Sequence, residues 1–244
     1  MSIKKLHRMS LSSVLKDVLP AQRIAEQYIY GVTTDSRQVE AGFLFIASVG
    51  RSVDARLFVL SAIEKGASAV VYESSVAASA EVNQQLVAAR EQGVVTFALD
   101  DCNKHIGNIV AQYYMHPSLQ MNIVGVTGTN GKSSCVSIMS QALHAFEHKV
   151  GVVGTLGWGM VDKLKSTNMT TPDIVTLQSY CASLRDEGAQ SMALEISSHA
   201  LDQNRIQGLN VDIAVFVNLT RDHLDYHNDF ESYAKAKLSL FLRP

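Results

Sequence analysis

Residues 123–134, IVGVTGTNGKSS, have the residue types of a phosphate-binding loop that follows an apolar segment. The first N–H groups of a helix are unpaired and carry partial positive charge, so a loop that enters a helix attracts anions. Gly128 and Gly131 let the backbone wrap around a phosphate without Cβ clashes. Lys132 can reach the β- and γ-phosphates, and the Ser133 hydroxyl can bind Mg²⁺. The residues predicted to bind ATP are Gly128, Thr129, Asn130, Gly131, Lys132, Ser133 and Ser134.

The loop departs from the common pattern G-x-x-x-x-G-K-[ST], which would place a glycine at position 126. Val126 stands there, and the earlier glycine of the segment is Gly125. The alternative interpretation is a glycine-rich turn with an exposed lysine. The apolar segment before the loop, the helical pattern after it and the serine next to the lysine favour a nucleotide site.

A second group of candidate residues follows two later apolar segments. Glu195 ends SMALE, and VDIAVFVNL is followed by Asp222, His223, Asp225 and His227. The carboxyl ends of parallel strands meet at one edge of a sheet, where ligands bind. Glu195 alone could be a helix-capping carboxylate, and the Asp/His group alone could be a polar loop. With a phosphate loop at the same edge they predict an ATP–Mg²⁺ site, since Mg²⁺ takes oxygen ligands.

The segments that must position these residues alternate between apolar runs and helical patterns, which predicts an α/β fold along the chain. The apolar runs at 191–196 and 211–219 predict parallel strands covered on both faces. Thr171-Pro172 indicates a helix start, because proline at the first helical position loses no bonded N–H. We place a domain boundary near Asp101, which separates residues 1–101 from residues 102–244. The other expected elements are helices within 10–19 (capped by Ser10), 54–66, 81–91, 101–117, 133–147 and around Tyr233, and strands within 28–37, 42–48, 68–72, 94–99, 121–126 and 149–155.

Composition excludes several classes of protein. The chain has 244 residues, of which 47 % are hydrophobic and 18 % charged, as in a globular protein with a core. The formal net charge of −2 does not indicate a nucleic-acid or anionic-membrane partner. No apolar run approaches the ~20 residues that span a bilayer. The three cysteines lack a C-x-x-C pair, which favours a cytoplasmic location over a disulfide framework or a zinc site.

Several motifs resemble, in order and spacing, those of the ATP-dependent Mur ligases of peptidoglycan synthesis. These motifs are TGTNGKSS, MTTPD, LEISSHALDQNR, NLTRDHLDYH and YAKAK, and in addition TTDSR and SVGRSVDARLF resemble the N-terminal domain of the member that adds the third peptide residue. The resemblance implies a small N-terminal UDP-binding α/β domain and a P-loop-type, parallel-sheet central domain that binds ATP. Members of this family also have a third domain. We expect this chain to carry an incomplete central domain and to lack the third one. We therefore expect a fragment of a longer protein, or a shortened chain, that lacks turnover alone.

The resemblance also implies a reaction on a UDP-N-acetylmuramoyl-dipeptide. ATP phosphorylates the γ-carboxylate of its D-glutamate, the amine of a diamino acid attacks the acyl phosphate, and phosphate leaves; the charge of the phosphoryl group must be stabilised. The implied catalytic residues are Lys132, Glu195, His223 and Lys237. The implied magnesium ligands are Ser133, Glu195, His223 and Lys237, the last as a carbamate. The implied substrate-binding residues are Thr34, Ser36, Arg51, Ser52, Val53, Asn130, Thr170, Thr171, Ser197, Gln203 and Arg205.

Two lysines in YAKAK compete for the carbamylated position. Lys235 and Lys237 are two residues apart, about 200° around a helix, so they cannot both face the site. Tyr233 and Lys237 are four residues apart and share a helix face. The family's modified lysine matches Lys237 by position.

Two departures from the family pattern affect single contacts. Ala55 follows Asp54 where the family usually has glycine, and Met169 stands where several relatives have a polar residue. Two other functions stay open, a folylpolyglutamate synthase-like ligase and a non-catalytic nucleotide- or UDP-sugar-binding module. The identity of the third residue, meso-diaminopimelate or lysine, and the oligomeric state stay open as well.

Overall fold

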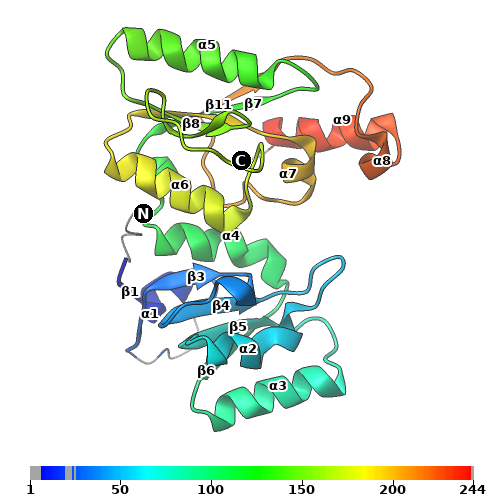
Figure 1. Cartoon of the computed structure of the whole chain (residues 1–244). Coiled ribbons are helices and arrows are strands. Elements are labelled where there is room, and N and C mark those ends of the chain that lie inside the picture. Colours follow the sequence, from blue (N-terminus) through cyan, green and yellow to red (C-terminus); the bar gives the residue numbers. More distant parts are fainter. Residues whose placement is uncertain (1–6, 20–23, 25, 243–244) are drawn as a thin grey trace. The chain divides into compact units, whose positions relative to one another are not determined.

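The computed structural model describes residues 7–19, 24 and 26–242. The chain forms two compact units, Met1–Met115 and His116–Pro244, each built on a mainly parallel sheet (Figure 1). The predicted α/β fold class is therefore confirmed. None of the helices in the described ranges is long and apolar enough to cross a membrane.

The boundary between the units falls later than the predicted one at Asp101. Helix α4, Cys102–Tyr113, packs against elements of the first unit, α1 and β3. The Cys102 N–H donates to the buried Glu73 carboxylate at 2.7 Å, and the Asn103 amide donates to the Val49 carbonyl at 2.7 Å. The helix therefore completes the core of the first unit, and the prediction that it opens the second domain is corrected.

The first unit alternates short strands and helices along residues 7–115. Its sheet has the order β3-β4-β5-β6, and all neighbouring strands in it are parallel. Its elements are β1 Met9–Ser10, α1 Leu11–Leu15, β2 Tyr28–Ile29, β3 Gly31–Thr33, η1 Ser36–Gln38, β4 Phe43–Ala47, η2 Ala55–Phe58, α2 Val59–Glu64, β5 Ala69–Glu73, α3 Ala80–Glu91, β6 Val95–Leu99 and α4. The predicted N-cap is confirmed, since the Ser10 side chain accepts from the Ser13 N–H.

Helices cover both faces of this sheet. Phe43, Phe45 and Ala47 of β4 belong to the cluster that buries α2 and α3, and Figure 1 shows α4 on the other face. Residues in a strand alternate between faces, so the fully buried β4 supplies apolar side chains to both layers.

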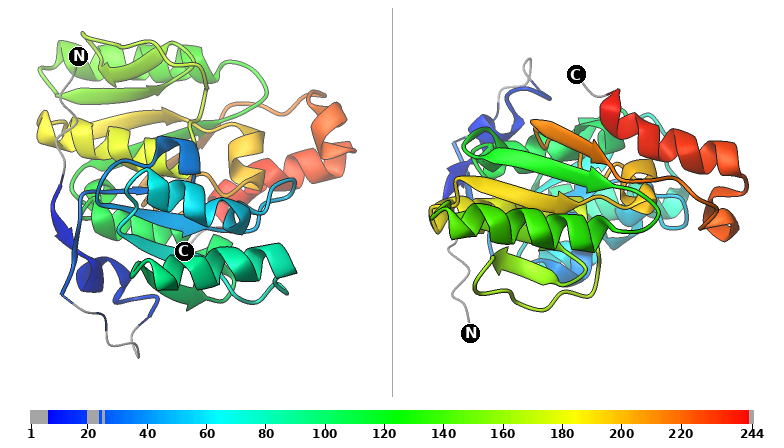
Figure 2. Two further views of the ribbon diagram at one scale, coloured as in Figure 1. Left: turned by 60° about the horizontal axis from the view of Figure 1, so that its bottom comes forward. Right: turned by 90° about the horizontal axis from the view of Figure 1, so that it is seen from above.

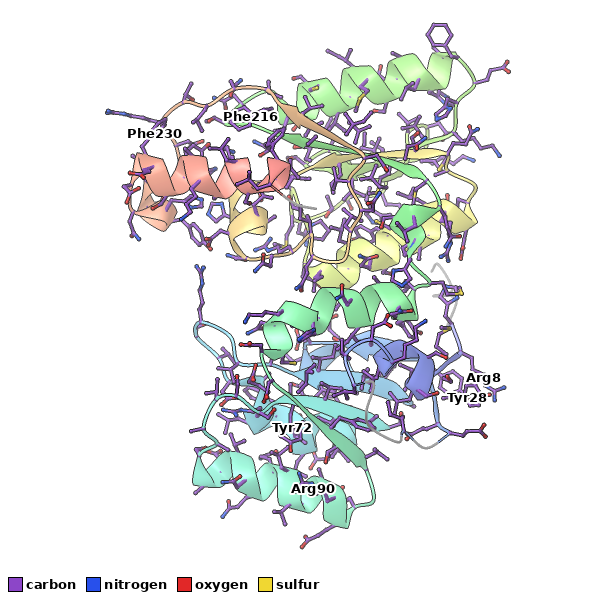
Figure 3. The ribbon with its side chains drawn as sticks, turned by 180° about the vertical axis from the view of Figure 1, so that it is seen from behind. Arg8, Tyr28, Tyr72, Arg90, Phe216 and Phe230 are labelled. Carbon is purple, nitrogen blue, oxygen red and sulfur yellow. The ribbon has the colours of Figure 1, made fainter. Side chains whose placement is uncertain are left out.

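Side-chain contacts tie the elements of this unit together. Arg90 of α3 donates to the hydroxyls of Tyr72 on β5 and Thr96 on β6, 3.1 Å in each case (Figure 3). The Arg8 guanidinium carbon lies 3.8 Å from the centroid of the Tyr28 ring.

The second unit has a five-stranded sheet with the order β11-β7-β10-β8-β9. The first four strands are parallel, and β9 is antiparallel to β8. The elements of this unit are η3 Pro117–Leu119, β7 Asn122–Thr127, α5 Lys132–Ala145, β8 Val150–Gly154, β9 Gly157–Met160, α6 Ile174–Asp186, β10 Ser191–Glu195, α7 Ser198–Asp202, β11 Ile213–Phe216, α8 Leu224–His227, α9 Phe230–Leu238 and η4 Ser239–Phe241.

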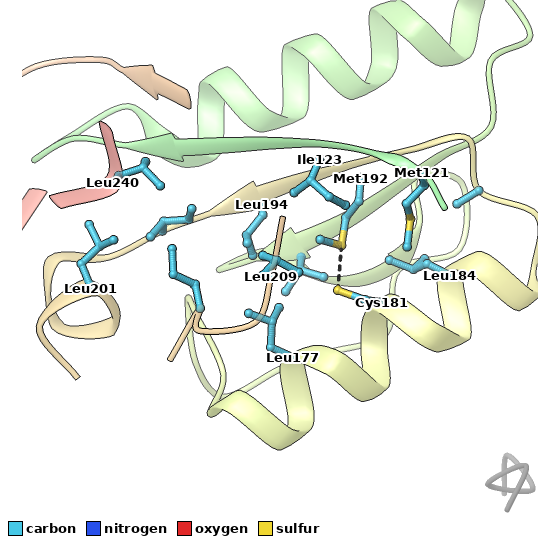
Figure 4. Packing of buried hydrophobic residues seen from close by; sticks show 14 residues of the cluster. Met121, Ile123, Leu177, Cys181, Leu184, Met192, Leu194, Leu201, Leu209 and Leu240 are labelled. Carbon is cyan, nitrogen blue, oxygen red and sulfur yellow. Dashed lines mark hydrogen bonds between the residues drawn. The ribbon is translucent and has the colours of Figure 1, made fainter. Parts of the chain in front are cut away.

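Two apolar clusters hold α5 and α6 on opposite faces of the sheet (Figure 1). The α5 face includes Val124, Val126 and Ala193, whereas Ile123 and Met192 point to α6. Figure 4 shows the α6 cluster, and the right-hand view of Figure 2 looks onto α5 across the strands. Successive side chains point to opposite faces of the sheet, and both faces are covered by helices. These strands therefore appear in the sequence as continuous apolar runs.

Two local expectations need correction, and one strand of this unit lies outside the predicted elements. Helix α6 begins at Ile174, and its N-cap is Asp173, whose carboxylate accepts from the Val175 and Thr176 N–H groups. Pro172 therefore precedes the cap instead of occupying the first helical position. Strand β9 was not expected. Strand β11 is only partly covered, with Ile213 55 % exposed, because it ends the sheet formed by the described residues.

Candidate active site

The loop 128–131 joins β7 to α5 as predicted. Gly131 is the N-cap of α5 with a φ of 82°, a conformation that glycine adopts at little cost. A Cβ at Gly128 would lie 3.1 Å from Val217 Cβ, and a Cβ at Gly131 would lie 3.3 Å from Val217 Cγ1. The two glycines therefore let the loop lie close against the segment that follows β11.

That segment holds the loop through hydrogen bonds. The Asn130 N–H donates to Asn218 Oδ1 and the Asn218 amide donates to the Asn130 carbonyl, both at 3.1 Å. The Thr129 N–H donates to the Asn218 carbonyl at 3.1 Å, and the Thr220 N–H donates to Thr129 Oγ1 at 2.9 Å. Sequence reasoning missed Asn218, which fell inside the predicted strand 211–219, and Thr220, which follows it; the observed strand ends earlier, at Phe216.

Tyr233 of α9 contacts the loop from another side. Its hydroxyl lies 2.8 Å from Thr129 Oγ1, and both residues are buried. Buried polar groups are expensive to leave unpaired, so this contact fixes the position of α9 against the loop.

Lys132 lies over the loop. Its Nζ donates to the carbonyls of Gly128 at 2.8 Å and Thr129 at 2.9 Å. Burial lowers the pKa of Lys132, and the charges of Glu195 and Asp222 oppose that shift. The cation is therefore close to the loop, where an anionic ligand would lie.

Glu195 ends β10 at the carboxyl edge of the sheet, and its side chain is 1 % exposed. The Ser133 hydroxyl donates to Glu195 Oε2 at 2.9 Å. Thr155, which the sequence did not indicate, donates to Oε1 through its N–H at 2.9 Å and to Oε2 through its hydroxyl at 3.1 Å. Mg²⁺ usually takes one or two carboxylates together with waters and phosphate oxygens, so the oxygen atoms of Ser133 and Glu195 fit this ion.

Lys237 faces the same loop from α9. It is 1 % exposed, and its Nζ donates to the Gly128 carbonyl at 2.8 Å and lies 4.7 Å from the centroid of the Tyr233 ring. Burial, together with the nearby Lys132 charge, lowers the pKa of Lys237 to about 8. Lys235 is exposed. The prediction that Lys237 rather than Lys235 shares a face with Tyr233 is confirmed.

The expected magnesium ligands are only partly assembled. His223 has a φ of 53°, and its ring lies 4.9 Å from that of His199 between centroids. Within the part of the chain that the structure describes, no three His, Cys, Asp or Glu residues come close enough to hold a metal ion. Ser133 and Glu195 form one pair, whereas the His223 ring contacts the rings of His199 and Tyr233.

Four predicted substrate residues of the second unit form one network beside Glu195. Thr171 Oγ1 donates to the Glu195 carbonyl at 2.9 Å and accepts from the Ser197 N–H at 3.0 Å. Arg205 donates to the Thr171 carbonyl at 2.9 Å and to Gln203 Oε1 at 2.6 Å.

Two further residues extend this network. The Thr170 hydroxyl lies 2.9 Å from that of Thr155. The Gln203 amide donates to the Tyr226 hydroxyl at 2.9 Å, a contact that sequence reasoning missed.

The remaining predicted substrate residues lie in the first unit. Thr34 follows β3, and Ser36 begins η1. Residues 51–53 form the exposed tip of the loop after β4, and the Gly50 N–H donates to the Val53 carbonyl across its base at 2.8 Å. Because β3 and β4 are parallel neighbours, both groups lie at the carboxyl edge of this sheet.

Gly154→Ala tests the packing of Glu195. A Cβ at position 154 would lie 2.3 Å from Glu195 Oε1, so the carboxylate must move away from its donors. Loss of donors to a buried carboxylate should lower the free energy of unfolding by about 1–3 kcal/mol, measured by urea unfolding. In a Glu195→Ala background, Gly154→Ala should lower the free energy of unfolding much less. An equal decrease in both backgrounds would contradict the predicted clash.

Comparison with known proteins places this arrangement in a family. Residues 28–114 match the family described as Mur ligase family, catalytic domain, and residues 126–244 match the Mur ligase middle domain. The chain belongs to the Mur ligase family. Its two units correspond to the two matched Mur ligase regions, and the boundary at residue 115 falls in the gap between them.

Curated Mur ligases resemble the chain over nearly its whole length. The UDP-N-acetylmuramoyl-L-alanyl-D-glutamate–2,6-diaminopimelate ligase of Coxiella burnetii is 42 % identical over 232 residues, which cover 95 % of this chain and 46 % of that protein. The enzyme of the same name from Xylella fastidiosa strain Temecula1 is 40 % identical over 233 residues, which cover 96 % of this chain and 44 % of that protein. The chain thus spans about half the length of these relatives.

Solved structures of Mur ligases superpose on nearly the whole of this chain. A UDP-N-acetylmuramoyl-L-alanyl-D-glutamate–2,6-diaminopimelate ligase superposes with a TM-score of 0.76 at 32 % identity, covering 96 % of this chain and 45 % of that one. A MurF structure from Acinetobacter baumannii superposes with a TM-score of 0.62 at 17 % identity, covering 97 % and 47 %, which supports the shared fold alone.

Proposed function

We propose that this chain supplies the UDP-substrate and ATP sites of a ligase that adds a diamino acid to UDP-N-acetylmuramoyl-L-alanyl-D-glutamate. One observation carries the proposal. The phosphate loop, with Lys132 above it, lies beside the Ser133–Glu195 pair, and the Thr171–Ser197–Arg205 network adjoins the same glutamate. A phosphoryl donor and a carboxylate substrate would therefore meet at this edge. The names of the similar proteins specify 2,6-diaminopimelate, which we propose as the incoming amino acid.

The proposed reaction converts a poor leaving group into a good one. A carboxylate oxygen of the substrate attacks the γ-phosphorus of ATP, ADP leaves, and an acyl phosphate forms. The amine nitrogen then attacks the acyl carbon, loses a proton, and inorganic phosphate leaves as the amide forms. Lys132 stabilises the transferring oxygens electrostatically, and loop N–H groups at the start of α5 bind the other phosphates.

A magnesium ion would be held by Ser133 and Glu195 in this proposal, with His223 and a carbamylated Lys237 as further ligands. When bound, Mg²⁺ would neutralise phosphate charge during the transfer. The chain's own residues prepare the site, since the Ser133 hydroxyl and Glu195 Oε2 already lie 2.9 Å apart.

Carbamylation of Lys237 fits its surroundings. The neutral amine adds CO₂ through a new N–C bond and releases a proton. A carbamate keeps one N–H, which can still donate to the Gly128 carbonyl that accepts from Nζ now. The nearby Lys132 cation, which disfavours the Lys237 ammonium, favours an anionic adduct.

The activity test uses a protein of the relatives' length that contains this chain. Phosphate release should require ATP, UDP-N-acetylmuramoyl-L-alanyl-D-glutamate and 2,6-diaminopimelate together, and lysine in place of diaminopimelate tests the selection of the third residue. Phosphate release with folate substrates would favour a folylpolyglutamate synthase-like ligase instead. Nucleotide binding without turnover would favour a non-catalytic binding module.

We propose that the first unit binds the uridine part through Thr34, Ser36 and residues 51–53. Ser36→Trp should weaken binding of the UDP-substrate far more than binding of ATP, because the bulky ring would block the edge after β3. Calorimetric titration with each ligand measures this. Ser12→Trp, an exposed position of α1, is the size-matched control. Equal loss of both ligands in the Ser36 variant would count against a uridine site there.

A further inference from the structure

Thr155, to which the proposed reaction assigns no role, is the main partner of the Glu195 carboxylate. Its N–H donates to Oε1 at 2.9 Å, and its hydroxyl donates to Oε2 at 3.1 Å. Ser133 supplies one further donor to Oε2. Since the carboxylate is almost fully buried, these donors decide where its oxygens lie.

The direction of the next hydrogen bond follows from the count of protons. A threonine hydroxyl has one proton to donate. Because Thr155 gives its proton to Glu195, Thr170 must be the donor in the 2.9 Å contact between the two threonine hydroxyls. A directed chain therefore runs from Thr170 through Thr155 to Glu195.

A tight hairpin turn determines the place of Thr155. Gly154 and Gly157 are partners in the antiparallel pair β8–β9, so Thr155 is the first residue of a two-residue hairpin turn. Trp158 of the same hairpin stacks on Tyr180 of α6, with ring centroids 3.8 Å apart and an interplanar angle of 5°. The hairpin is thus fastened to the unit's core, and Gly154 leaves space for the carboxylate.

We propose that Thr155 is a positioning residue that sets the Mg²⁺ affinity of the site by fixing the Glu195 carboxylate beside Ser133 and tying it to Thr170. The inference rests on the proposed function, because it takes Ser133 and Glu195 as the magnesium-binding pair. Groups that hydrogen-bond to metal-binding residues commonly change metal affinity or activity by about 10–100-fold when they are removed.

The test compares Thr155→Val with Thr155→Ser. Valine keeps the shape and the backbone N–H but removes the hydroxyl, whereas serine retains it. Binding of ADP to each protein is titrated calorimetrically over a range of Mg²⁺ concentrations and again in EDTA. In Thr155→Val, the Mg²⁺ concentration at which the increase in ADP affinity is half-maximal should rise by roughly tenfold. The ADP affinity measured in EDTA should stay unchanged. Thr155→Ser should stay close to wild type.

Three results would overturn the inference. The first is a wild-type Mg²⁺ response in Thr155→Val, and the second is an equal shift in both variants. The third is an equal loss of ADP affinity with Mg²⁺ and in EDTA, which a general structural role would produce. A wild-type protein with no Mg²⁺-dependent ADP binding would instead overturn the proposed ATP–Mg²⁺ site, and the inference with it.

Thr170→Val tests the second link of the chain. Because Thr170 acts on Glu195 only through Thr155, adding Thr170→Val to Thr155→Val should not shift the Mg²⁺ response further. Additive shifts in the double variant would show that Thr170 acts by a separate route and would overturn the proposed tie.

Discussion

Lys132→Ala should abolish phosphoryl transfer, with a fall in kcat of roughly 10²–10³-fold or more. The reason is the position of Nζ, which lies over the carbonyls of Gly128 and Thr129 at the start of α5. Without this cation the charge on the transferring oxygens loses its nearest protein partner. Phosphate release by the longer protein measures the effect, and calorimetry should find UDP-substrate binding, assigned to the first unit, retained.

Lys149→Ala is the charge-matched control. Lys149 is exposed and belongs to no part of the proposed site, so its removal should leave turnover near the wild-type rate. Near-normal ATP turnover in Lys132→Ala would contradict the role given to the loop lysine. A parallel fall in both variants would point to net charge instead.

Lys237→Ala should lose nearly all activity, and short-chain carboxylic acids should restore part of it. The lysine is buried against the phosphate loop, so its truncation leaves space in which a small carboxylate can replace the carbamate oxygens. Steady-state rates with and without added acetate or propionate measure the rescue. Lys235→Ala, which removes an exposed lysine two residues earlier, is the matched control and should remain active.

Two outcomes would refute the assignment. Full activity of Lys237→Ala is one, and loss of activity in Lys235→Ala alone is the other. Absence of a carbamate signal on Lys237 in the active protein, by ¹³C NMR with labelled bicarbonate, would refute the modification itself.

The pKa of Lys237, lowered to about 8, predicts a pH dependence for CO₂ uptake. Only the neutral amine adds CO₂, and its fraction rises about tenfold per pH unit below the pKa. At constant dissolved CO₂, the initial rate of labelled carbamate formation should therefore rise up to about pH 8 and level off above it. A flat rate from pH 6 to pH 8, compared with Lys237→Ala as the blank, would contradict a buried reactive amine.

The same pKa has a consequence for stability. The folded protein disfavours the ammonium form of Lys237. The free energy of unfolding of the unmodified protein is therefore reduced below about pH 8, where the amine is charged in both the folded and the unfolded state. Between about pH 8 and the ordinary value of 10.5, only the unfolded chain binds the proton. The free energy of unfolding of CO₂-free protein should rise in that window, and Lys237→Met should lack this rise in urea titrations.

Local sequence patterns determined much of this site. The order of apolar runs and helical segments predicted the α/β fold, because burial on both sides of a parallel sheet leaves that pattern in the sequence. The loop at 128–131 and the end of β10 at Glu195 followed from the same pattern. The helical period predicted that only one of Lys235 and Lys237 could face the site, and the resemblance to the family selected Lys237. The two lysines differ in burial as that period requires.

Only the tertiary structure decided which distant side chains complete the site. Asn218, Thr220 and Tyr233 reach the loop from about 90 to 100 positions away in sequence, and neither spacing nor composition records such pairings. In the sequence Thr155 only ends the predicted strand within 149–155, and the hairpin β8–β9 brings it to Glu195. His223 was expected as a metal ligand from its place in the family motif, and only the fold shows that its ring contacts His199; its metal role stays a prediction. Helix α4 joins the first unit for the same reason, because packing across the fold, and not local pattern, determines which core a helix completes.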